Sequence, residues 1–306
     1  MTTEDEYLRS VERMLNGIAP EHRAAVIDDL RAHFADADEA GRPVEDTIRG
    51  LGSPIEIAER AAEEFAADAA AVDVRAERAW RMLQGAAVVL AVVIGVVAAF
   101  IMPSYTTGDG TSTLVAVNGL WVALIALVPA LVALVPFVVP RRARVITSVV
   151  AGVLLTAMVL IGGFTLGGFF LPTVLLAWTA LIVWTRMRRG SVFGLGWRIA
   201  GGVLTALPVL AFLAPVFGGM PGRYADGGSA FELSAWAWPF FAALLALAVL
   251  MTIGYRAAGW AVTAIGAIVL LVGLVSGQLL TLLFVWLGGW WLTIGLAHAV
   301  TASRRP

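Results

Sequence analysis

Apolar residues follow two different patterns along the chain, and the change between them falls near Trp80. Up to about residue 66 they recur three and four positions apart among charged residues, which is the pattern of short amphipathic helices. Beyond Trp80 they form runs of about 20 residues, the length that an α-helix needs to cross the hydrocarbon core of a membrane. The sequence therefore predicts an all-α protein, with a small N-terminal cytoplasmic helical domain followed by a transmembrane helical bundle.

The apolar runs predict eight transmembrane spans. They cover residues 82–102, 114–139, 145–163, 167–185, 197–217, 233–254, 257–276 and 279–299. Arginines occupy every second break between spans, whereas the alternate breaks carry little or no net positive charge. Because arginine-rich loops stay on the cytoplasmic side, we expect a multi-pass protein of the cell membrane with both termini in the cytoplasm.

Four helices are predicted within residues 1–68. Their inward stripes are Leu8, Val11, Leu15 and Ile18, then Ile27, Leu30 and Phe34, then Val44, Ile48 and Leu51. Gly41 is expected to end the second helix, and Ser53 and Glu56 to form a capping box at the start of the fourth. Residues 55–84 contain neither Gly nor Pro. The fourth helix can therefore run into the first span, with fraying around residues 69–73 as the alternative. The expected parts are a domain over 1–68, a connector over 69–81, the membrane region over 82–299 and a tail over 300–306.

Charge separates the same two regions. Residues 1–79 hold 19 of the 22 acidic side chains and 9 of the 21 arginines, a net charge of −10, whereas residues 80–306 carry a net charge of +9. An acidic domain repels the phosphates of nucleic acid, so direct nucleic-acid binding is disfavoured. Such a surface suits a basic protein partner instead.

Candidate chemistry is sparse. The chain has no cysteine and no lysine, which excludes thiolate nucleophiles, cysteine-ligated metals and Schiff bases. Asp29 and His33 are four residues apart and could pair on one helix face. His298 is expected to be an interfacial residue near the inner end of the last span. We predict no catalytic, cofactor or metal site, and no enzymatic activity.

Three tryptophans, Trp286, Trp290 and Trp291, lie deep within the last span. Their indole N–H groups need hydrogen-bond partners in an apolar environment. Packing against a neighbouring helix is the favoured explanation, and a pocket for a hydrophobic ligand is the alternative.

About 65 residues at the N-terminus resemble the HAAS domain, a small bacterial helical module found at the start of multi-span membrane proteins. The most specific pieces are the stretch from Asp29 to Phe34 and the sequence Leu51-Gly52-Ser53-Pro54 followed by Ile57-Ala58. The resemblance implies a protein encoded beside a PadR-like winged-helix repressor, which the domain would bind. The candidate docking residues are Asp28, Asp29, His33, Asp36, Asp38, Leu51, Gly52 and Pro54. Residues 51–54 are also explained as a helix stop and a capped helix start.

Two functional hypotheses follow. The first is a membrane signalling or regulatory protein whose acidic head docks a PadR-like transcriptional regulator. The second is a permease or transporter subunit for an uncharged or lipidic substrate, because HAAS-like heads also occur fused to permease-like regions. No charged residue lies in the middle third of any predicted span, which weakens ion-coupled transport. The expected partners are the regulator and the lipid bilayer, and a homo-oligomer stays open.

Overall fold

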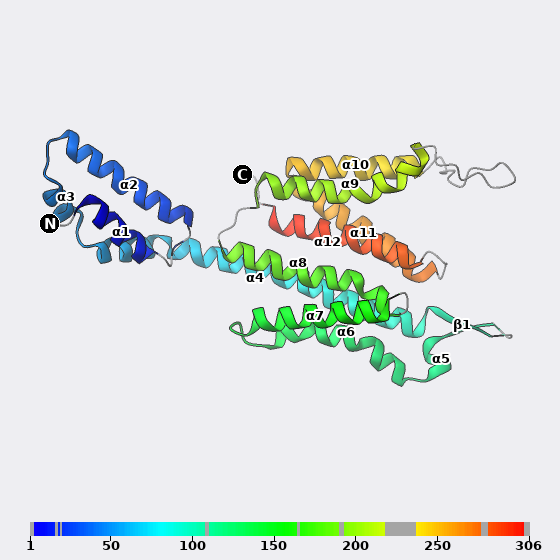
Figure 1. The fold of residues 1–306 in the computed structure, drawn as a ribbon. Helices are drawn as coiled ribbons and strands as arrows, with labels where there is room; N and C mark the ends of the chain where they lie inside the picture. Colours follow the sequence, from blue (N-terminus) through cyan, green and yellow to red (C-terminus); the bar gives the residue numbers. More distant parts are fainter. Residues whose placement is uncertain are drawn as a thin grey trace. The chain divides into compact units, whose positions relative to one another are not determined.

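A computed structural model describes residues 3–15, 18, 20–107, 110–163, 166–189, 193–217, 237–276 and 281–302. The chain divides into two compact units, and Figure 1 draws their helices in colours that follow the sequence. The head unit comprises Met1–Arg78 and Trp184–Val192, and the membrane unit comprises Ala79–Val183 and Phe193–Pro306.

Four helices form in the N-terminal region, as predicted. They are α1 (Glu4–Met14), α2 (Pro20–Glu39), α3 (Val44–Leu51) and α4 (Pro54–Phe100). Helix α2 ends at Glu39 and is followed by Gly41, whose φ of 67° is the left-handed conformation that glycine adopts easily. The N–H of Arg42 donates to Ala37 O over 2.9 Å and that of Gly41 to Asp38 O over 2.9 Å, which is the Schellman pattern. Helix α4 runs through residues 69–73 without a break, so the continuous alternative is correct.

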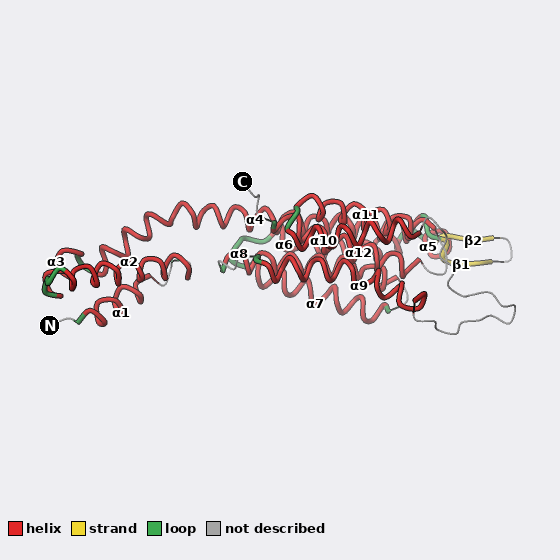
Figure 2. The backbone as a smooth tube through the Cα atoms, turned by 90° about the horizontal axis from the view of Figure 1, so that it is seen from above, coloured by secondary structure: helices red, strands yellow, loops and turns green. Residues whose placement is uncertain are grey.

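Helices dominate the membrane unit as well (Figure 2). After α4 come β1 (Pro103–Thr107), β2 (Gly110–Thr113), α5 (Leu114–Asn118), α6 (Trp121–Val138), α7 (Arg144–Gly162), the 3₁₀ helix η2 (Leu166–Phe170), α8 (Leu171–Arg188), α9 (Leu195–Phe217), α10 (Ala237–Ile253), α11 (Arg256–Ser276) and α12 (Thr281–Thr301). The strands pair as an antiparallel hairpin, with Thr106 opposite Thr111. The sequence analysis did not predict this hairpin, although threonine and tyrosine favour strands.

Within the described residues, seven helices are long and apolar enough to cross a membrane. They are Ala70–Phe100, Trp121–Val138, Arg144–Gly162, Leu166–Arg188, Leu195–Ala214, Arg256–Ser276 and Thr281–Thr301. They correspond to seven of the eight predicted spans. The remaining one, predicted over 233–254, coincides with α10, which is shorter at 17 residues. Residues 233–236 of that prediction lie outside the described residues.

Glycines spaced seven residues apart bring α11 and α12 close together. They are Gly259, Gly266 and Gly273 on α11, and Gly288 and Gly295 on α12. A Cβ atom added to Gly288 would lie 2.6 Å from Gly266 O, and one added to Gly266 would meet the backbone of Leu292. Because glycine has no side chain, the two backbones can approach closely, as is common where membrane helices cross. No larger residue would fit at these positions.

The three deep tryptophans of α12 all find partners on other elements. The indole N–H of Trp286 donates to Gly168 O over 2.7 Å, that of Trp290 to Leu204 O over 2.8 Å, and that of Trp291 to Thr205 O over 3.0 Å. The expectation of packing against neighbouring helices is therefore confirmed.

A proline explains one of these acceptors. A proline inside a helix has no N–H to bond the carbonyl four residues earlier, so that carbonyl needs another donor. Leu204 O lies four residues before Pro208, in the interior of α9. Trp290 of α12 thus satisfies a carbonyl that this proline leaves without its helical partner.

The expected interfacial position of His298 stays a prediction, but the residue is buried among the helices. Its side chain is 2% exposed, enclosed within the membrane unit near the end of α12. The sequence placed it correctly near the end of the span, but run length says nothing about which helix face is covered.

Candidate functional site

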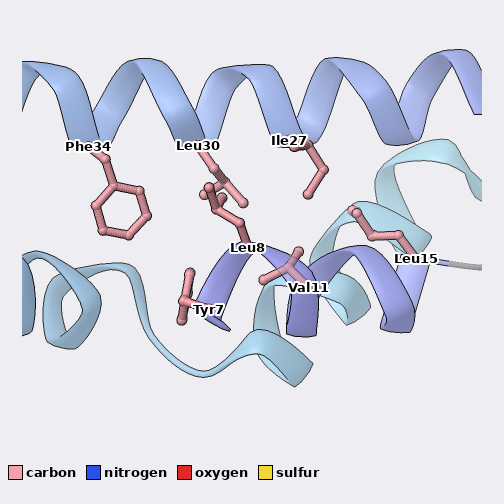
Figure 3. Close-up of a cluster of buried hydrophobic side chains, with 8 residues drawn as sticks. Tyr7, Leu8, Val11, Leu15, Ile27, Leu30 and Phe34 are labelled. Atoms are coloured by element: carbon pink, nitrogen blue, oxygen red, sulfur yellow. The ribbon is translucent and has the colours of Figure 1, made fainter. Parts of the chain in front are cut away.

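The head core fixes which faces of its helices are available to a partner. Buried residues from α1, α2 and α4 form one cluster, namely Tyr7, Leu8, Val11, Leu15, Ile27, Leu30, Phe34 and Ala61 (Figure 3). The rings of Tyr7 and Phe34 meet edge to face, with centroids 6.0 Å apart. Since the stripe of α2 from Ile27 to Phe34 points into this cluster, the opposite side of α2 faces away from the cluster and is exposed.

That opposite side is here called the outer face of α2, and it consists of exposed acids and alanines. The residues are Ala25, Asp28, Asp29, Ala32, Asp36 and Glu39. The alanines are small, so the carboxylates stand out from a flat helical surface. Asp29 and Asp36 are two helical turns apart and, among the described residues, take part in no ion pair.

The spacing of Asp29 and His33 permits a pair that the structure does not form. No hydrogen bond or ion pair joins these two exposed side chains in the described part of the chain. Instead, Arg31 Nη1 bonds Asp28 Oδ1 over 3.0 Å. Arginine is always charged, and its fork of N–H donors matches a carboxylate, so Arg31 is a strong partner for Asp28.

The turn between α3 and α4 holds the second group of candidate residues. Gly52 has a φ of 92°, which side chains with a Cβ rarely adopt. The predicted capping box is confirmed, because Ser53 N–H donates to Glu56 Oε2 over 3.0 Å and Glu56 N–H donates to Ser53 Oγ over 3.3 Å. Leu51 is half-buried against the head core. These residues therefore all have a structural task.

Tyr7 joins this turn to α1, a contact that the sequence analysis missed. Its hydroxyl donates to Gly52 O over 2.9 Å. Burial, followed by the negative charge of Glu56, raises the pKa of Tyr7 above its ordinary value. An open groove of ≈ 420 Å³ lies beside the turn, with Glu6, Arg13, Ile48 and Pro54 in its walls. The only sequence signal for Tyr7 is its helical spacing of four residues from Val11.

The candidate docking residues thus fall into two groups that the structure does not merge into one cluster. Asp28, Asp29, His33, Asp36 and Asp38 are exposed on α2, whereas Leu51, Gly52 and Pro54 belong to the turn. Phe34 and Tyr7 pack between α2 and that turn. Asp29 and Asp36 take part in no ion pair among the described residues, and the docking role of the acids of α2 stays a prediction.

A second contact missed from the sequence holds α2 against α4. The ring of His22 stacks on Phe65, with centroids 4.3 Å apart and planes 18° from parallel. Within the residues that the structure describes, no group of three or more His, Cys, Asp or Glu could hold a metal ion.

An ion pair anchors the connector within the head unit. Arg188 Nε, in the last turn of α8, bonds Asp73 Oδ1 over 3.0 Å. The Arg188 guanidinium also lies 5.3 Å from the ring centroid of Trp184. Arg188 and Asp73 are about half exposed, so this pair contributes at most about 1 kcal/mol, and its effect is positional.

Comparison with known families identifies the four-helix region. Residues 6–60 match the HAAS family. The match covers all eight candidate docking residues and ends within α4, so the membrane unit lies outside the HAAS domain. No curated protein and no solved structure matches the chain.

Proposed function

We propose that this chain is a membrane signalling protein whose HAAS domain docks a transcriptional regulator of PadR type. The observation that carries the proposal is the outer face of α2, where exposed carboxylates stand away from the head core. The HAAS match supports the type of partner, since this domain is associated with PadR-like regulators.

Charge complementarity supports the choice of a DNA-binding partner. A protein that binds DNA carries a basic face, and an acidic helix attracts such a face at long range. The attraction speeds association and fixes orientation more than it adds affinity. Docking through the DNA-binding face would compete with DNA, so the membrane protein would hold the regulator away from its operator.

Helix α4 offers a route for signals in this scheme. Its first turns belong to the HAAS domain, and residues 70–100 are the first segment long and apolar enough to cross a membrane. The bond between Arg188 and Asp73 ties the same helix to the end of α8. A change among the membrane helices would reach the docking domain through these two connections.

The scheme requires that the HAAS domain lie in the cytoplasm. Reporter fusions test this orientation directly. Fusions after Arg142, Arg189 and Arg256 are expected to report the inside, and fusions after Asp109, Asp226 and Gly277 the outside. A reproducible reversal at one of these six positions would contradict the proposed topology.

The docking itself is tested by titrating the full-length protein in lipid nanodiscs with the PadR-type regulator of the same organism. The double variant Asp29→Lys/Asp36→Lys reverses two carboxylates on the outer face of α2. It should weaken binding by about tenfold or more, which corresponds to about 1.4 kcal/mol. Binding should also slow as salt shortens the screening length below about 8 Å.

A matched control separates the position of the charges from their number. Glu63→Lys/Glu64→Lys makes the same change in net charge at exposed positions of α4 and should have a much smaller effect. Equal losses in the two double variants would refute docking on α2. No binding by the parent protein at high micromolar concentration would refute the proposed function and favour the transporter hypothesis.

A further inference from the structure

A small pocket lies inside the membrane unit, between α8, α9 and α12. Its volume is ≈ 120 Å³. The walls include Thr179 of α8, Gly201 and Leu204 of α9, and Thr293, Ile294 and His298 of α12. Apart from the imidazole and the two threonines, these side chains are apolar or absent. The pocket is therefore a mostly apolar space, and its strongest hydrogen-bonding group is the imidazole of His298.

That group, His298, is unsatisfied. Its side chain is 2% exposed, and neither ring nitrogen has a hydrogen-bond partner within the described residues. The imidazole lines the pocket, and a Cβ atom added to Gly201 would lie 3.4 Å from its Nδ1 atom. Leaving a buried polar group without a partner is unfavourable, so a pocket lined by such a group is a candidate ligand site.

Water can satisfy only part of this pocket, next to the imidazole of His298 and the hydroxyl of Thr179. Each buried water needs about two to four polar partners. Thr293 Oγ1 already donates to Gly289 O over 2.8 Å, and Trp197 Nε1 donates to Thr301 Oγ1 over 2.9 Å. The wall segments formed by Ala200, Leu204 and Ala297 offer no side-chain partner. An apolar cavity of about 150 Å³ in another protein stays dry and binds benzene, which sets the scale of a suitable ligand.

We propose that this pocket binds a small uncharged molecule, about the size of benzene, that carries one hydroxyl group bonded to His298. A neutral imidazole has one N–H donor and one acceptor nitrogen, and a hydroxyl can meet either of them. The apolar remainder of the ligand fills the space against Leu204 and Ile294. A charged ligand is disfavoured, because no ionised side chain lines the pocket to compensate its desolvation.

The test uses the full-length protein in nanodiscs with ¹⁵N-labelled histidine, whose three imidazoles are followed by NMR. The resonances of His298 are assigned with the variant His298→Gln. Cyclopentanol is the probe, and methylcyclopentane is its partner of the same shape without the hydroxyl. Cyclopentanol should shift the His298 nitrogens in a saturable way, whereas those of His22 and His33, which lie in the head, should stay in place.

Two glycine variants of α9 provide the controls. Gly201→Ala places a methyl group in ordinary van der Waals contact with His298 and should weaken the cyclopentanol response by about tenfold or more. Gly196→Ala makes the same change where no atom lies within 4 Å and should leave the response intact. A response that does not saturate, that persists unchanged in Gly201→Ala, or that methylcyclopentane produces equally at the nitrogens would overturn the proposal.

Discussion

Replacing Trp290 with Phe is expected to destabilise the membrane unit by removing one hydrogen bond while an aromatic ring stays in place. The indole N–H donates to Leu204 O over 2.8 Å. Pro208, four residues further along α9, cannot supply the N–H that this carbonyl would have in a regular helix. The variant therefore leaves Leu204 O without a donor in an environment that offers no water.

The size of the effect follows from the environment. Hydrogen bonds between membrane helices contribute about 0.6 kcal/mol on average and up to about 1.7 kcal/mol. The acceptor here has no intrahelical alternative, so we expect a loss in the upper half of that range. The smaller ring adds a packing loss, which a double-mutant cycle removes.

The second mutation of the cycle is Pro208→Ala. It introduces an N–H at position 208 that can bond Leu204 O within α9, so the carbonyl keeps a donor when the indole is lost. Trp290→Phe should then cost about 1 kcal/mol less in the Pro208→Ala background than in the parent protein. Unfolding free energies are compared by circular dichroism during unfolding in mixed micelles, since tryptophan fluorescence would change with the mutation itself.

Trp260→Phe serves as the control. Trp260 of α11 is 41% exposed and has no hydrogen bond at its indole in the described part of the structure. Its replacement should cost the same in both backgrounds. If Trp290→Phe also costs the same in both, the carbonyl freed by Pro208 does not depend on the indole, and the reasoning fails.

Three further predictions concern other contacts. The raised pKa of Tyr7 means that folding favours its neutral hydroxyl. The contribution of this hydroxyl to the free energy of unfolding is therefore present below the ordinary pKa of 10.0 and is lost as the pH rises through the folded-state pKa. Alkaline unfolding of the head should therefore shift in Tyr7→Phe, and identical pH profiles would contradict this. Phe34→Ala should cost about 3–5 kcal/mol of head stability, measured by urea unfolding, and a small loss would show that the cluster does not depend on this ring. Gly266→Ala should cost about 1–3 kcal/mol, because the new methyl meets the backbone of α12, whereas Gly85→Ala, with no atom within 4 Å, should be neutral or stabilising; equal effects in the same micelle assay would disprove the close contact.

Local signals account for the parts of the head that the sequence predicted. The stop at Gly41 and the capping box of Ser53 and Glu56 depend on residues within a few positions of one another, and both form as expected. The stripe from Ile27 to Phe34 is buried because helical periodicity alone places it on one face. Such features need no knowledge of the tertiary fold.

Contacts between distant residues were beyond the same reasoning. Tyr7 bonds Gly52 across 45 positions, and His22 stacks on Phe65, although neither pair has a sequence pattern that joins its members. On α2, Asp29 and His33 have a spacing that permits a pair, but the competing neighbours Asp28 and Arg31 form one. Spacing shows which side chains can meet, whereas charge and solvation decide which of them do.

In the membrane unit too, features within one helix were predicted and contacts between helices were not. Run length predicted where the spans lie, because the thickness of the bilayer sets it. It could not predict that α12 would face α9, nor that His298 would be enclosed. The relevant residues were nevertheless visible in the sequence, as prolines inside spans and tryptophans deep within the last one.

The pairing of a proline in one span with a tryptophan in another follows from a single constraint. A span with an internal proline has a carbonyl that neither water nor its own helix can satisfy, so a neighbouring helix must bring a donor. Tryptophan suits this task, because its indole carries one N–H and no acceptor that would itself need a partner. Trp290 of α12 supplies such a donor to the carbonyl four residues before Pro208, and that carbonyl belongs to Leu204, a wall residue of the His298 pocket. The hydrogen bond that makes this proline tolerable thereby also fixes the position of the pocket wall, which links the stability of this part of the bundle to the shape of its candidate ligand site.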